Sequence, residues 1–361
     1  MAKRIAILTG GGDAPGLNGV IRAVVKSADN QGSSDIIGIR HGFEGFLKED
    51  GTLPLAYTDV RDILPKGGTV LGAANRGNPF ARVEIQDGEE VTVDVSGEVV
   101  ARIEELGLDG LIVVGGDGTL GIAKDLHAKG VPVVGVPKTI DNDVGGTEVT
   151  FGFDTALKVA MEAIDRLRTT AESHHRIMLL EVMGRNAGFI ALHAGISGGA
   201  EVILIPEIPF KLDKVANTIK QRMAIGRSFS IVVVSEGAHA AGGEQVYWLE
   251  GELPHMARLG GVGHQVGAYL QEAVGAETRV TVLGHIQRGG TPTAFDRWLA
   301  TRYGAAALRL ALRGGFGRMV AYQCEAVVDI PLEEALATPK RVDLAGDALR
   351  SARDMGIEFG D

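Results

Sequence analysis

The stretch Val136-Pro137-Lys138-Thr139-Ile140-Asp141-Asn142-Asp143 decides the interpretation of this chain, because an apolar strand runs directly into polar and acidic side chains. Upstream, the apolar run 111–114 ends in Gly115-Gly116-Asp117-Gly118-Thr119. In an open parallel sheet, ligands gather beyond the carboxyl ends of the strands, so both segments are expected to face one crevice. Bare backbone N–H groups, an Asp that can hold hydrated magnesium and an Asp that can accept a proton are what phosphoryl transfer requires.

A third glycine-rich segment lies near the N-terminus. The apolar run 5–8 leads into Thr9-Gly10-Gly11-Gly12-Asp13-Ala14-Pro15-Gly16, and a helix is expected to begin near Leu17. A strand, a loop and a helix N-terminus in this order form an anion site from backbone N–H groups and the helix dipole. The spacing fits neither the dinucleotide fingerprint nor the Walker loop. Alone the segment is explained nearly as well by a tight turn, but with the other two segments it predicts a phosphate site.

Apolar runs alternate with helical patterns along most of the chain. Strands are expected at 4–8, 35–39, 110–114, 131–136, 176–182, 201–205, 230–234 and 279–283. Helices are expected at 17–28, 119–128, 153–170 and 186–196. Strands that alternate with helices predict a parallel, right-handed α/β arrangement. The segment 82–95 instead alternates polar and apolar residues around Asp87-Gly88, which predicts a two-stranded hairpin.

Composition limits the classes of protein to which this chain can belong. With 361 residues, 45% of them hydrophobic, the chain can bury a large core and is long enough for two domains. Its single cysteine, Cys324, excludes an intramolecular disulfide, fits a reducing cytoplasm and is expected to be a buried apolar residue. The net charge of −10 argues against a nucleic-acid-binding surface, and no segment approaches transmembrane length.

Five motifs occur together in this chain, and their combination is far more specific than any one of them. They lie at 9–18, 115–119, 137–143, 181–185 and 284–290. In order and spacing they resemble the signatures of the 6-phosphofructokinase family, over roughly the first three hundred residues. NAD and lipid kinases also carry a Gly-Gly-Asp-Gly-Thr loop, but they lack the acidic cluster and the last motif. The resemblance implies phosphorylation of the 1-hydroxyl of fructose 6-phosphate by ATP, or in some branches by pyrophosphate, with Mg²⁺.

The resemblance also implies an architecture. We expect an α/β fold of two doubly wound domains, with mainly parallel sheets flanked by helices and the active site in the cleft between them. Residues 1–152 plus 287–337 would form the nucleotide domain, and 153–286 plus 338–361 the sugar-phosphate domain. A cytoplasmic homo-oligomer is implied, a tetramer or a dimer, with substrate sites shared between subunits and with no nucleic-acid or membrane partner.

Asp141 is interpreted as the general base, because a carboxylate within hydrogen-bond reach of the sugar hydroxyl can take its proton as the phosphoryl group arrives. An Asp-Asn-Asp cluster is also good helix-capping chemistry, and for Asp143 an electrostatic role and a capping role both stay open. Thr139 is expected to orient the transferring phosphate through its hydroxyl. The resemblance adds Arg185 as a catalytic cation near that phosphate.

For the phosphoryl donor, Gly12 is expected to supply a backbone N–H, and Asp117 resembles the family's magnesium-site Asp. The implied donor-binding residues are Gly12, Arg76, Gly116, Asp117, Gly118, Thr119 and Lys138. The loop 71–79 is one residue longer than the family's usual pattern. The phosphate contact in this loop therefore stays open between Arg76 and an Asn of 73–78.

For the sugar phosphate, the chain offers arginines, whose planar fork makes paired hydrogen bonds to phosphate. The implied substrate-binding residues are Thr139, Asp141, Arg176, Met183, Gly184, Arg185, Glu236, Arg279, His285 and Arg288. In the family, the counterparts of Arg176 and Arg279 reach across from a neighbouring subunit.

Two positions disagree about the donor. Gly118 is the choice of ATP users, since pyrophosphate users place an Asp there that fills the space of the α-phosphate, whereas Lys138 is the pyrophosphate-type choice. Steric exclusion outweighs a flexible lysine, so ATP is expected and pyrophosphate is the alternative. A non-catalytic sensor of sugar phosphate or nucleotide should have lost a catalytic group, but Asp117, Asp141 and Arg185 are all present.

The family's effector site is lined by several cations. In this chain Arg22 and Glu201 remain and Lys26 is a substitute, but Tyr57 and Phe229 stand where the family has an Arg and a His. Each charge-assisted bond contributes about 1.5–3 kcal/mol, so losing two predicts weak effector control.

Overall fold

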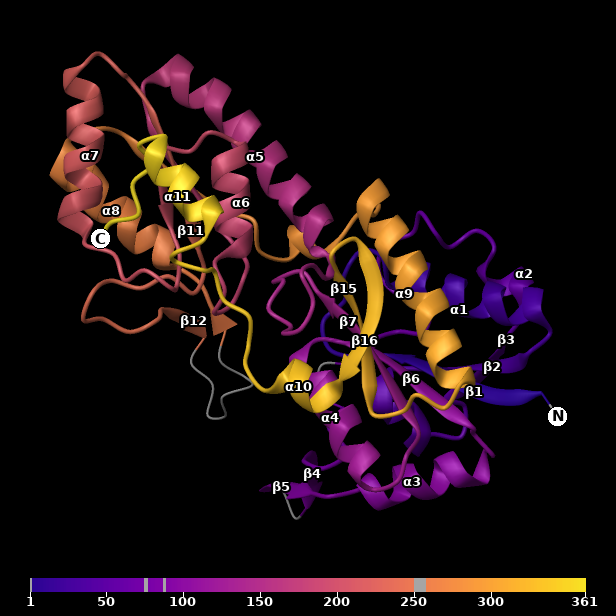
Figure 1. The fold of residues 1–361 in the computed structure, drawn as a ribbon. Helices are drawn as coiled ribbons and strands as arrows, with labels where there is room; N and C mark the ends of the chain where they lie inside the picture. The colour runs from indigo at the N-terminus through magenta and orange to yellow at the C-terminus, as the bar shows by residue number, and fades with distance from the viewer. Residues whose placement is uncertain (1, 75–76, 87–88, 250–257) are drawn as a thin grey trace. The chain divides into compact units, whose positions relative to one another are not determined.

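The computed structural model describes residues 2–74, 77–86, 89–249 and 258–361, and its chain divides into two compact units (Figure 1). The first unit comprises Met1–Asp154 and Arg288–Pro339, and the second comprises Thr155–Gln287 and Lys340–Asp361. Each unit is therefore built from two separate stretches of chain. No helix among the described residues is long and apolar enough to cross a membrane.

The first unit is built on a mainly parallel sheet. Its strands are β1 (Lys3–Thr9), β2 (Ser34–Ile39), β3 (Thr52–Leu55), β6 (Gly110–Gly115), β7 (Val133–Thr139), β8 (Phe151–Gly152), β15 (Arg318–Gln323) and β16 (Ala326–Pro331). The order is β16-β15-β7-β6-β1-β2-β3, with β8 also paired to β7. Only the edge strands β3 and β16 run antiparallel to their neighbours within this described sheet.

Alternation along β1 shows why this sheet is covered on both faces. Ile5 and Ile7 belong to one hydrophobic cluster, while Ala6 and Leu8 belong to another, because successive side chains point to opposite faces. The first cluster includes α1 (Leu17–Gln31) and α9 (Ala294–Leu312); the second includes α3 (Ser96–Glu105), α4 (Asp117–Ala128), α10 (Leu332–Leu336) and the 3₁₀ helix η1 (Gly42–Leu47). Figure 1 shows α1 and α9 on one side of the sheet and α3 and α4 on the other.

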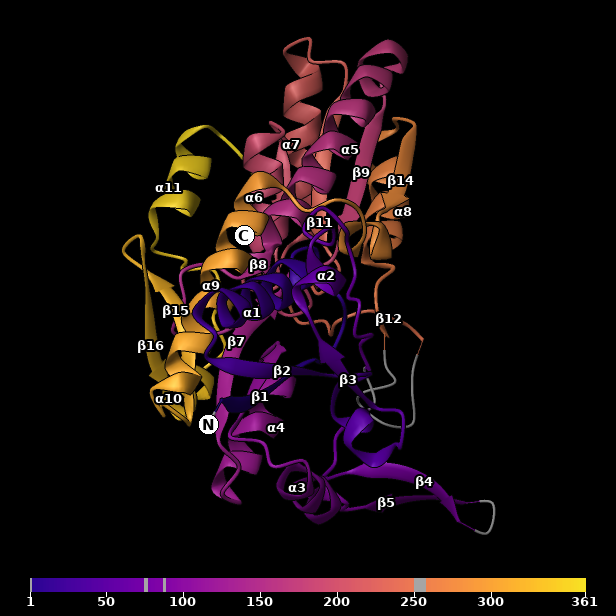
Figure 2. The same cartoon turned by 90° about the vertical axis from the view of Figure 1, so that its right-hand side faces the viewer.

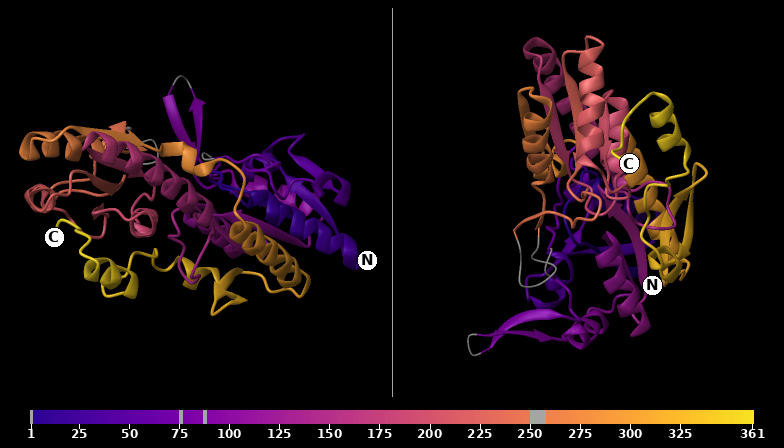
Figure 3. Two further views of the ribbon diagram at one scale, coloured as in Figure 1. Left: turned by 90° about the horizontal axis from the view of Figure 1, so that it is seen from above. Right: turned by 90° about the vertical axis from the view of Figure 1, so that its left-hand side faces the viewer.

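The hairpin expected at 82–95 is present. Strands β4 (Arg82–Gln86) and β5 (Glu89–Val93) pair antiparallel and project from the first unit (Figure 3). The Asp87-Gly88 turn itself lies outside the described residues. A short helix, α2 (Tyr57–Val60), completes the first unit.

The second unit has a four-stranded, fully parallel sheet in the order β10-β11-β9-β14. Its strands are β9 (Ile177–Val182), β10 (Val202–Leu204), β11 (Ser230–Ser235) and β14 (Thr278–Val282), and β14 lies beside β9 (Figure 2). The helices are α5 (Phe153–His174), α6 (Phe189–Ser197), α7 (Leu212–Ala224), α8 (Val262–Val274) and α11 (Asp347–Asp354), with a 3₁₀ helix η2 (Gly284–Arg288). A short antiparallel pair joins β12 (Tyr247–Leu249) to β13 (Arg258–Leu259).

The C-terminal segment is part of the second unit. Glu358 forms a bridge with Val202 of β10, and the Ile203 N–H donates to the Glu358 carbonyl at 2.9 Å. Phe359 is fully buried. These contacts explain why residues 340–361 join this unit although the preceding segment belongs to the other.

Two expectations were wrong in detail. The helix expected from 186 begins only at Phe189, because Gly184 and Arg185 have φ values of 145° and 48° and turn the chain sharply before it. Cys324 is exposed, since it occupies the β15–β16 turn with φ 46°. A thiol at the tip of an edge hairpin has no core to enter.

Candidate functional site

The carboxyl end of β7 is a rigid, buried polar segment. Thr139, Asp141 and Asn142 are only 8%, 3% and 5% exposed. The Asp141 N–H donates to Thr139 Oγ1 at 3.0 Å, so this hydroxyl already orders the acidic loop. Asn142 adopts φ 56°, and its Oδ1 accepts the Thr150 N–H at 3.1 Å. The loop that carries Asp141 is therefore fixed by its own hydrogen bonds.

Two acidic side chains, one from each of two strand ends, act on the carboxyl group of Asp143. Burial, together with the neighbouring charges of Asp141 and Asp117, raises the pKa of Asp143 from 3.8 to about 6, against smaller opposing effects of a backbone hydrogen bond and a hydrogen bond from Thr139. Asp117 begins α4 directly after β6, whereas Asp141 follows β7, which is the neighbouring strand. The structure thus brings together carboxylates that are far apart in the sequence.

The glycines of the two loops allow close packing around Thr119. A Cβ added to Gly115 would lie 2.3 Å from the Thr119 Cβ, and one added to Gly10 would lie 2.6 Å from its Cγ2. Both separations are far shorter than any real contact, so larger residues there would force the loops apart. Gly118 differs, because an added Cβ would have nothing within 4 Å. The α4 N-terminus is therefore open at Gly118, while Gly116 caps the helix.

Two cations lie against the N-terminal glycine loop. Lys138 is only 4% exposed, and its ammonium donates to the Gly12 carbonyl. Arg288 Nη1 donates to the Asp13 carbonyl at 3.1 Å, and a Cβ on Gly12 would come within 2.7 Å of this nitrogen. Lys138 and Arg288 both belong to the first unit, as does the loop that they contact. Arg76 lies outside the described residues.

In the second unit, the carboxyl end of β9 carries a strained loop. Met183 N–H donates to Gln287 Oε1 at 2.8 Å, and Arg185 N–H donates to Glu236 Oε1 at 3.1 Å. Gly184 follows directly after Met183, and the Ala187 N–H closes a tight turn onto its carbonyl at 2.9 Å. His285 lies in η2, just beyond the carboxyl end of β14.

Arg176 and Arg279 lie at the opposite end of the same sheet. Arg176 directly precedes β9, and Arg279 is the second residue of β14. Arg176 Nε donates to Glu277 Oε2 at 2.7 Å, and Arg279 pairs with the other oxygen of Glu277. The two guanidinium groups hold the pKa of Glu277 below its usual value, first through the hydrogen bond from Arg176.

The six residues of β9 separate these arginines from Arg185 by roughly 20 Å at about 3.3 Å per residue. The structure therefore does not bring all the expected sugar-phosphate residues of this unit together. It places Met183, Gly184, Arg185, Glu236 and His285 at one edge of the sheet, and Arg176 and Arg279 at the other.

Sequence reasoning gave no role to Glu277 or to Gln287. Glu277 stands two residues before Arg279 and directly precedes β14, so extended backbone there puts both side chains on one side of the chain and could have indicated the pair. Gln287 lies inside the motif 284–290, and its full burial was not readable from a loop sequence.

Around the positions compared with the effector site, aromatic rings stand beside cations. Lys26 Nζ lies 5.7 Å from the centre of the Tyr57 ring in the first unit. In the second unit, the Arg168 guanidinium lies 5.8 Å from the Phe229 ring, and Glu201 pairs with Arg222 at 2.9 Å. Lys26 and Glu201 thus already have partners within their own units.

Comparisons with known proteins define the family. The chain belongs to the phosphofructokinase family, whose model matches residues 4–311. An ATP-dependent 6-phosphofructokinase of Chloroflexus aggregans is 54% identical over 99% of this chain and 98% of its own length. A pyrophosphate–fructose 6-phosphate 1-phosphotransferase of Amycolatopsis mediterranei is 49% identical over 94% of this chain and 96% of its own length. Relatives named for either donor are thus similar to this chain at comparable identity.

Solved structures of phosphofructokinases have the same fold as this chain. Phosphofructokinase of Pichia pastoris superimposes with a TM-score of 0.81 at 32% identity, covering 93% of this chain. This chain spans only 36% of the Pichia chain and 45% of the matching Saccharomyces cerevisiae chain. A pyrophosphate-dependent phosphofructokinase of Marinobacter aquaeolei, 21% identical with a TM-score of 0.80 over 99% of this chain and 92% of its own, shares the fold.

Proposed function

We propose that this chain is an ATP-dependent 6-phosphofructokinase, which transfers a phosphoryl group from ATP to the 1-hydroxyl of fructose 6-phosphate and yields fructose 1,6-bisphosphate in the cytoplasm. The observation that carries the proposal is the gathering of Asp117, Asp141 and Asp143 beside an α4 N-terminus that is open at Gly118. Relatives named for this activity cover nearly the whole chain at 47–54% identity. We assign the donor to the first unit and the sugar phosphate chiefly to the second.

Asp141 takes the proton of the 1-hydroxyl in this proposal. Its backbone N–H donates to Thr139 Oγ1, so the backbone that carries the carboxylate is held before substrate arrives. Asp143 contributes a second negative charge beside Asp141. Arg185 supplies positive charge to the phosphoryl group in transit, and Thr139 is assigned to orient that group through its hydroxyl.

The donor site suits Mg²⁺ bound through few protein ligands. Among the described residues, no group of three or more His, Cys, Asp or Glu side chains could hold a metal ion by itself. Mg²⁺ is usually bound by one or two carboxylates together with substrate phosphates and water. Asp117 is exposed at the start of α4 and adds to the negative charge felt by Asp143, so its carboxylate fits this role. When bound, the cation neutralises charge on the donor phosphates.

Pyrophosphate is the second candidate donor, because Lys138 places a buried ammonium on the glycine loop. That ammonium donates to the Gly12 carbonyl, so the lysine has a structural use whatever the donor. We infer that Gly118 determines the choice of donor, which is ATP, and that Lys138 supports the glycine loop. The remaining donor contacts assigned to Gly12, Gly116, Thr119 and Arg76 belong to the same proposal.

We further infer that the protein works as a homo-oligomer, a tetramer or a dimer, with shared sugar-phosphate sites. Roughly 20 Å along β9 separates Arg176 and Arg279 from Arg185. One phosphorylated sugar is too short to use both edges of one sheet. Each pair of arginines would therefore complete the site of a neighbouring subunit, while His285 and Arg288 serve the site of their own.

The test is to measure fructose 1,6-bisphosphate formation with ATP and with pyrophosphate in parallel, both with Mg²⁺. We expect efficient use of ATP and poor use of pyrophosphate. Gly118→Asp should lower kcat/KM for ATP by about 10²-fold, since a like charge next to phosphate costs several kcal/mol. Lys138→Met keeps the buried volume and should change ATP use by less than about 10-fold. Efficient turnover with pyrophosphate and none with ATP would transfer the function to the second candidate.

A further inference from the structure

The loop that carries Arg185 adopts a conformation that needs support. Arg185 has φ 48°, in the left-handed region that residues with a Cβ seldom occupy, and it follows Gly184 at φ 145°. Such a backbone persists only when the surroundings determine it. One support is the Glu236 carboxylate, which accepts the Arg185 N–H.

A second support comes from Gly237, which packs directly on Arg185. A Cβ added to Gly237 would lie only 1.8 Å from the Arg185 carbonyl oxygen. Residues 236–237 and 185–186 therefore touch through backbone, and neither segment can move away without opening this contact.

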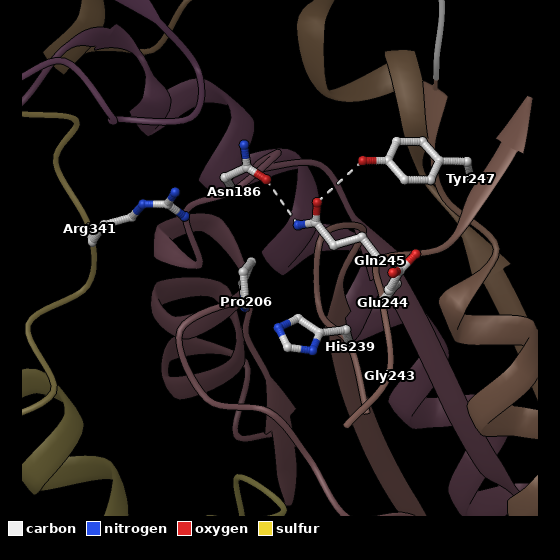
Figure 4. Close-up of a pocket in the computed structure, with 8 residues that line it drawn as sticks. All are labelled: Asn186, Pro206, His239, Gly243, Glu244, Gln245, Tyr247 and Arg341. Carbon is white, nitrogen blue, oxygen red and sulfur yellow. Dashed lines mark hydrogen bonds between the residues drawn. The ribbon is translucent and has the colours of Figure 1, made fainter. Parts of the chain in front are cut away.

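Gln245 joins these two segments from a third. Its Nε2 donates to Asn186 Oδ1 at 2.9 Å and to the Gly237 carbonyl at 3.0 Å. A carbonyl oxygen only accepts hydrogen bonds, so the amide nitrogen of Gln245 must face it, and this fixes the orientation of the amide. Figure 4 shows Gln245 reaching across to Asn186 on the wall of an open cavity of about 470 Å³, which His239 and Arg341 also line.

We propose that Gln245 is a positioning residue for phosphoryl transfer, which holds Arg185 in its left-handed conformation by tying Asn186 to Gly237. The inference rests on the catalytic role proposed for Arg185. Asn186 is the next residue after Arg185, and Gly237 is the next residue after Glu236. The amide group of Gln245 therefore binds the residues that follow Arg185 and Glu236, and so supports the hydrogen bond between the Arg185 N–H and the Glu236 carboxylate.

Two substitutions of Gln245 separate the loss of its hydrogen bonds from the loss of its shape. Gln245→Ala removes both hydrogen bonds, and Gln245→Glu keeps the shape but places an oxygen against the Gly237 carbonyl. We expect kcat to fall about 5- to 30-fold in Gln245→Ala, as two neutral hydrogen bonds allow, and further in Gln245→Glu. Glu244→Gln is the matched control, because Glu244 is the exposed neighbour on the same cavity wall and should leave kcat unchanged.

A double-mutant cycle with Arg185→Ala distinguishes positioning from general damage to the fold. If Gln245 acts through Arg185, Gln245→Ala should lower kcat little or not at all when Arg185 is already absent. An equal loss in both backgrounds would overturn the proposal. So would an unchanged kcat in both variants of Gln245.

Hydrogen exchange of the ligand-free protein gives a readout that does not depend on activity. Backbone amides of 184–187 should exchange faster in Gln245→Ala than in the unmodified protein, while those of β9 stay protected. If the unmodified protein transfers no phosphoryl group, the proposed function fails but this exchange difference is still expected. Unchanged exchange in an active protein would instead contradict the positioning role alone.

Discussion

The two ends of β9 hold their arginines in opposite ways. At the carboxyl end, the backbone of Arg185 is fixed by Glu236 and Gly237, and its side chain is exposed. At the amino end, Arg176 directly precedes β9 and Arg279 is the second residue of the neighbouring β14, and their side chains share the carboxylate of Glu277. In the proposed function, Arg185 acts during phosphoryl transfer, so it must be held in place before the reaction. Arg176 and Arg279 are proposed to bind the sugar phosphate, so they can rest on the carboxylate of Glu277 until that phosphate replaces it.

The comparison predicts that strand carboxyl ends govern turnover. Asp141→Ala, at the carboxyl end of β7, should lower kcat about 10²- to 10⁴-fold, because a general base acts chiefly in the transition state. Binding of fructose 6-phosphate, measured by equilibrium titration, should change little. Near-normal turnover in a variant with unchanged circular dichroism would remove Asp141 from the mechanism.

The amino end of β9 should instead govern affinity. Arg176→Ala should raise KM for fructose 6-phosphate about 10- to 100-fold, as expected for one charge-assisted hydrogen bond to phosphate, with kcat within about 3-fold. Steady-state kinetics at saturating ATP measure both constants. Arg222→Ala, which removes another cation paired with a carboxylate in this unit, is the control. A fall in kcat without a change in KM would erase the distinction between the two ends.

Mixing two chains that are each nearly inactive at low fructose 6-phosphate tests whether the two ends serve different sites. An Arg176→Ala chain and an Asp141→Ala chain, refolded together in equal amounts, should regain about a quarter of full activity if subunits pair at random, when activity is assayed at fructose 6-phosphate far below the raised KM of Arg176→Ala. Some hybrid sites then draw Asp141 from one chain and Arg176 from the other. Absence of recovery, with mixed oligomers demonstrated by mass spectrometry, would count against shared sites.

A smaller, thermodynamic effect is expected at Asp143. Because its folded pKa lies near 6 rather than 3.8, the folded state binds this proton more tightly, and stability should fall as pH rises from about 4 to about 6. Asp143→Asn cannot ionise, so relative to the unmodified protein it should gain about 3 kcal/mol in free energy of unfolding between pH 4 and pH 7.5. Urea unfolding in EDTA at both pH values measures this gain, with Asp165→Asn as an exposed control. If the free energies of unfolding of Asp143→Asn and the unmodified protein differed by the same amount at both pH values, the pKa of Asp143 would not be raised in the folded state.

The acidic strand ends of the first unit were predictable because their signals are local. Apolar runs that end in glycines and acids mark β6 and β7, and adjacent parallel strands bring Asp117 and Asp141 to one edge. The edge strand β3 escaped prediction, since its four residues include Pro54, which interrupts a strand pattern and is tolerated mainly at an edge.

The remaining features depend on distant parts of the chain. The expected strands already began at Arg176 and Arg279, but only the register that pairs Ile177 with Thr278 puts Glu277 beside Arg176. Likewise, nothing in the sequence around Gln245 indicates Asn186 as its partner, because 59 residues separate them. Strand positions follow from local patterns, whereas partners of polar side chains follow from tertiary packing.

The split of the first unit between two stretches of chain has a consequence for biosynthesis. β7 takes its neighbour β15 from residues that leave the ribosome only after the whole 155–287 segment of the second unit. Until then, the incomplete sheet exposes an unpaired edge and lacks α9, which covers one face. During that interval the nascent first unit exposes surface that favours aggregation, and a chaperone that binds it would act before residue 318 is made.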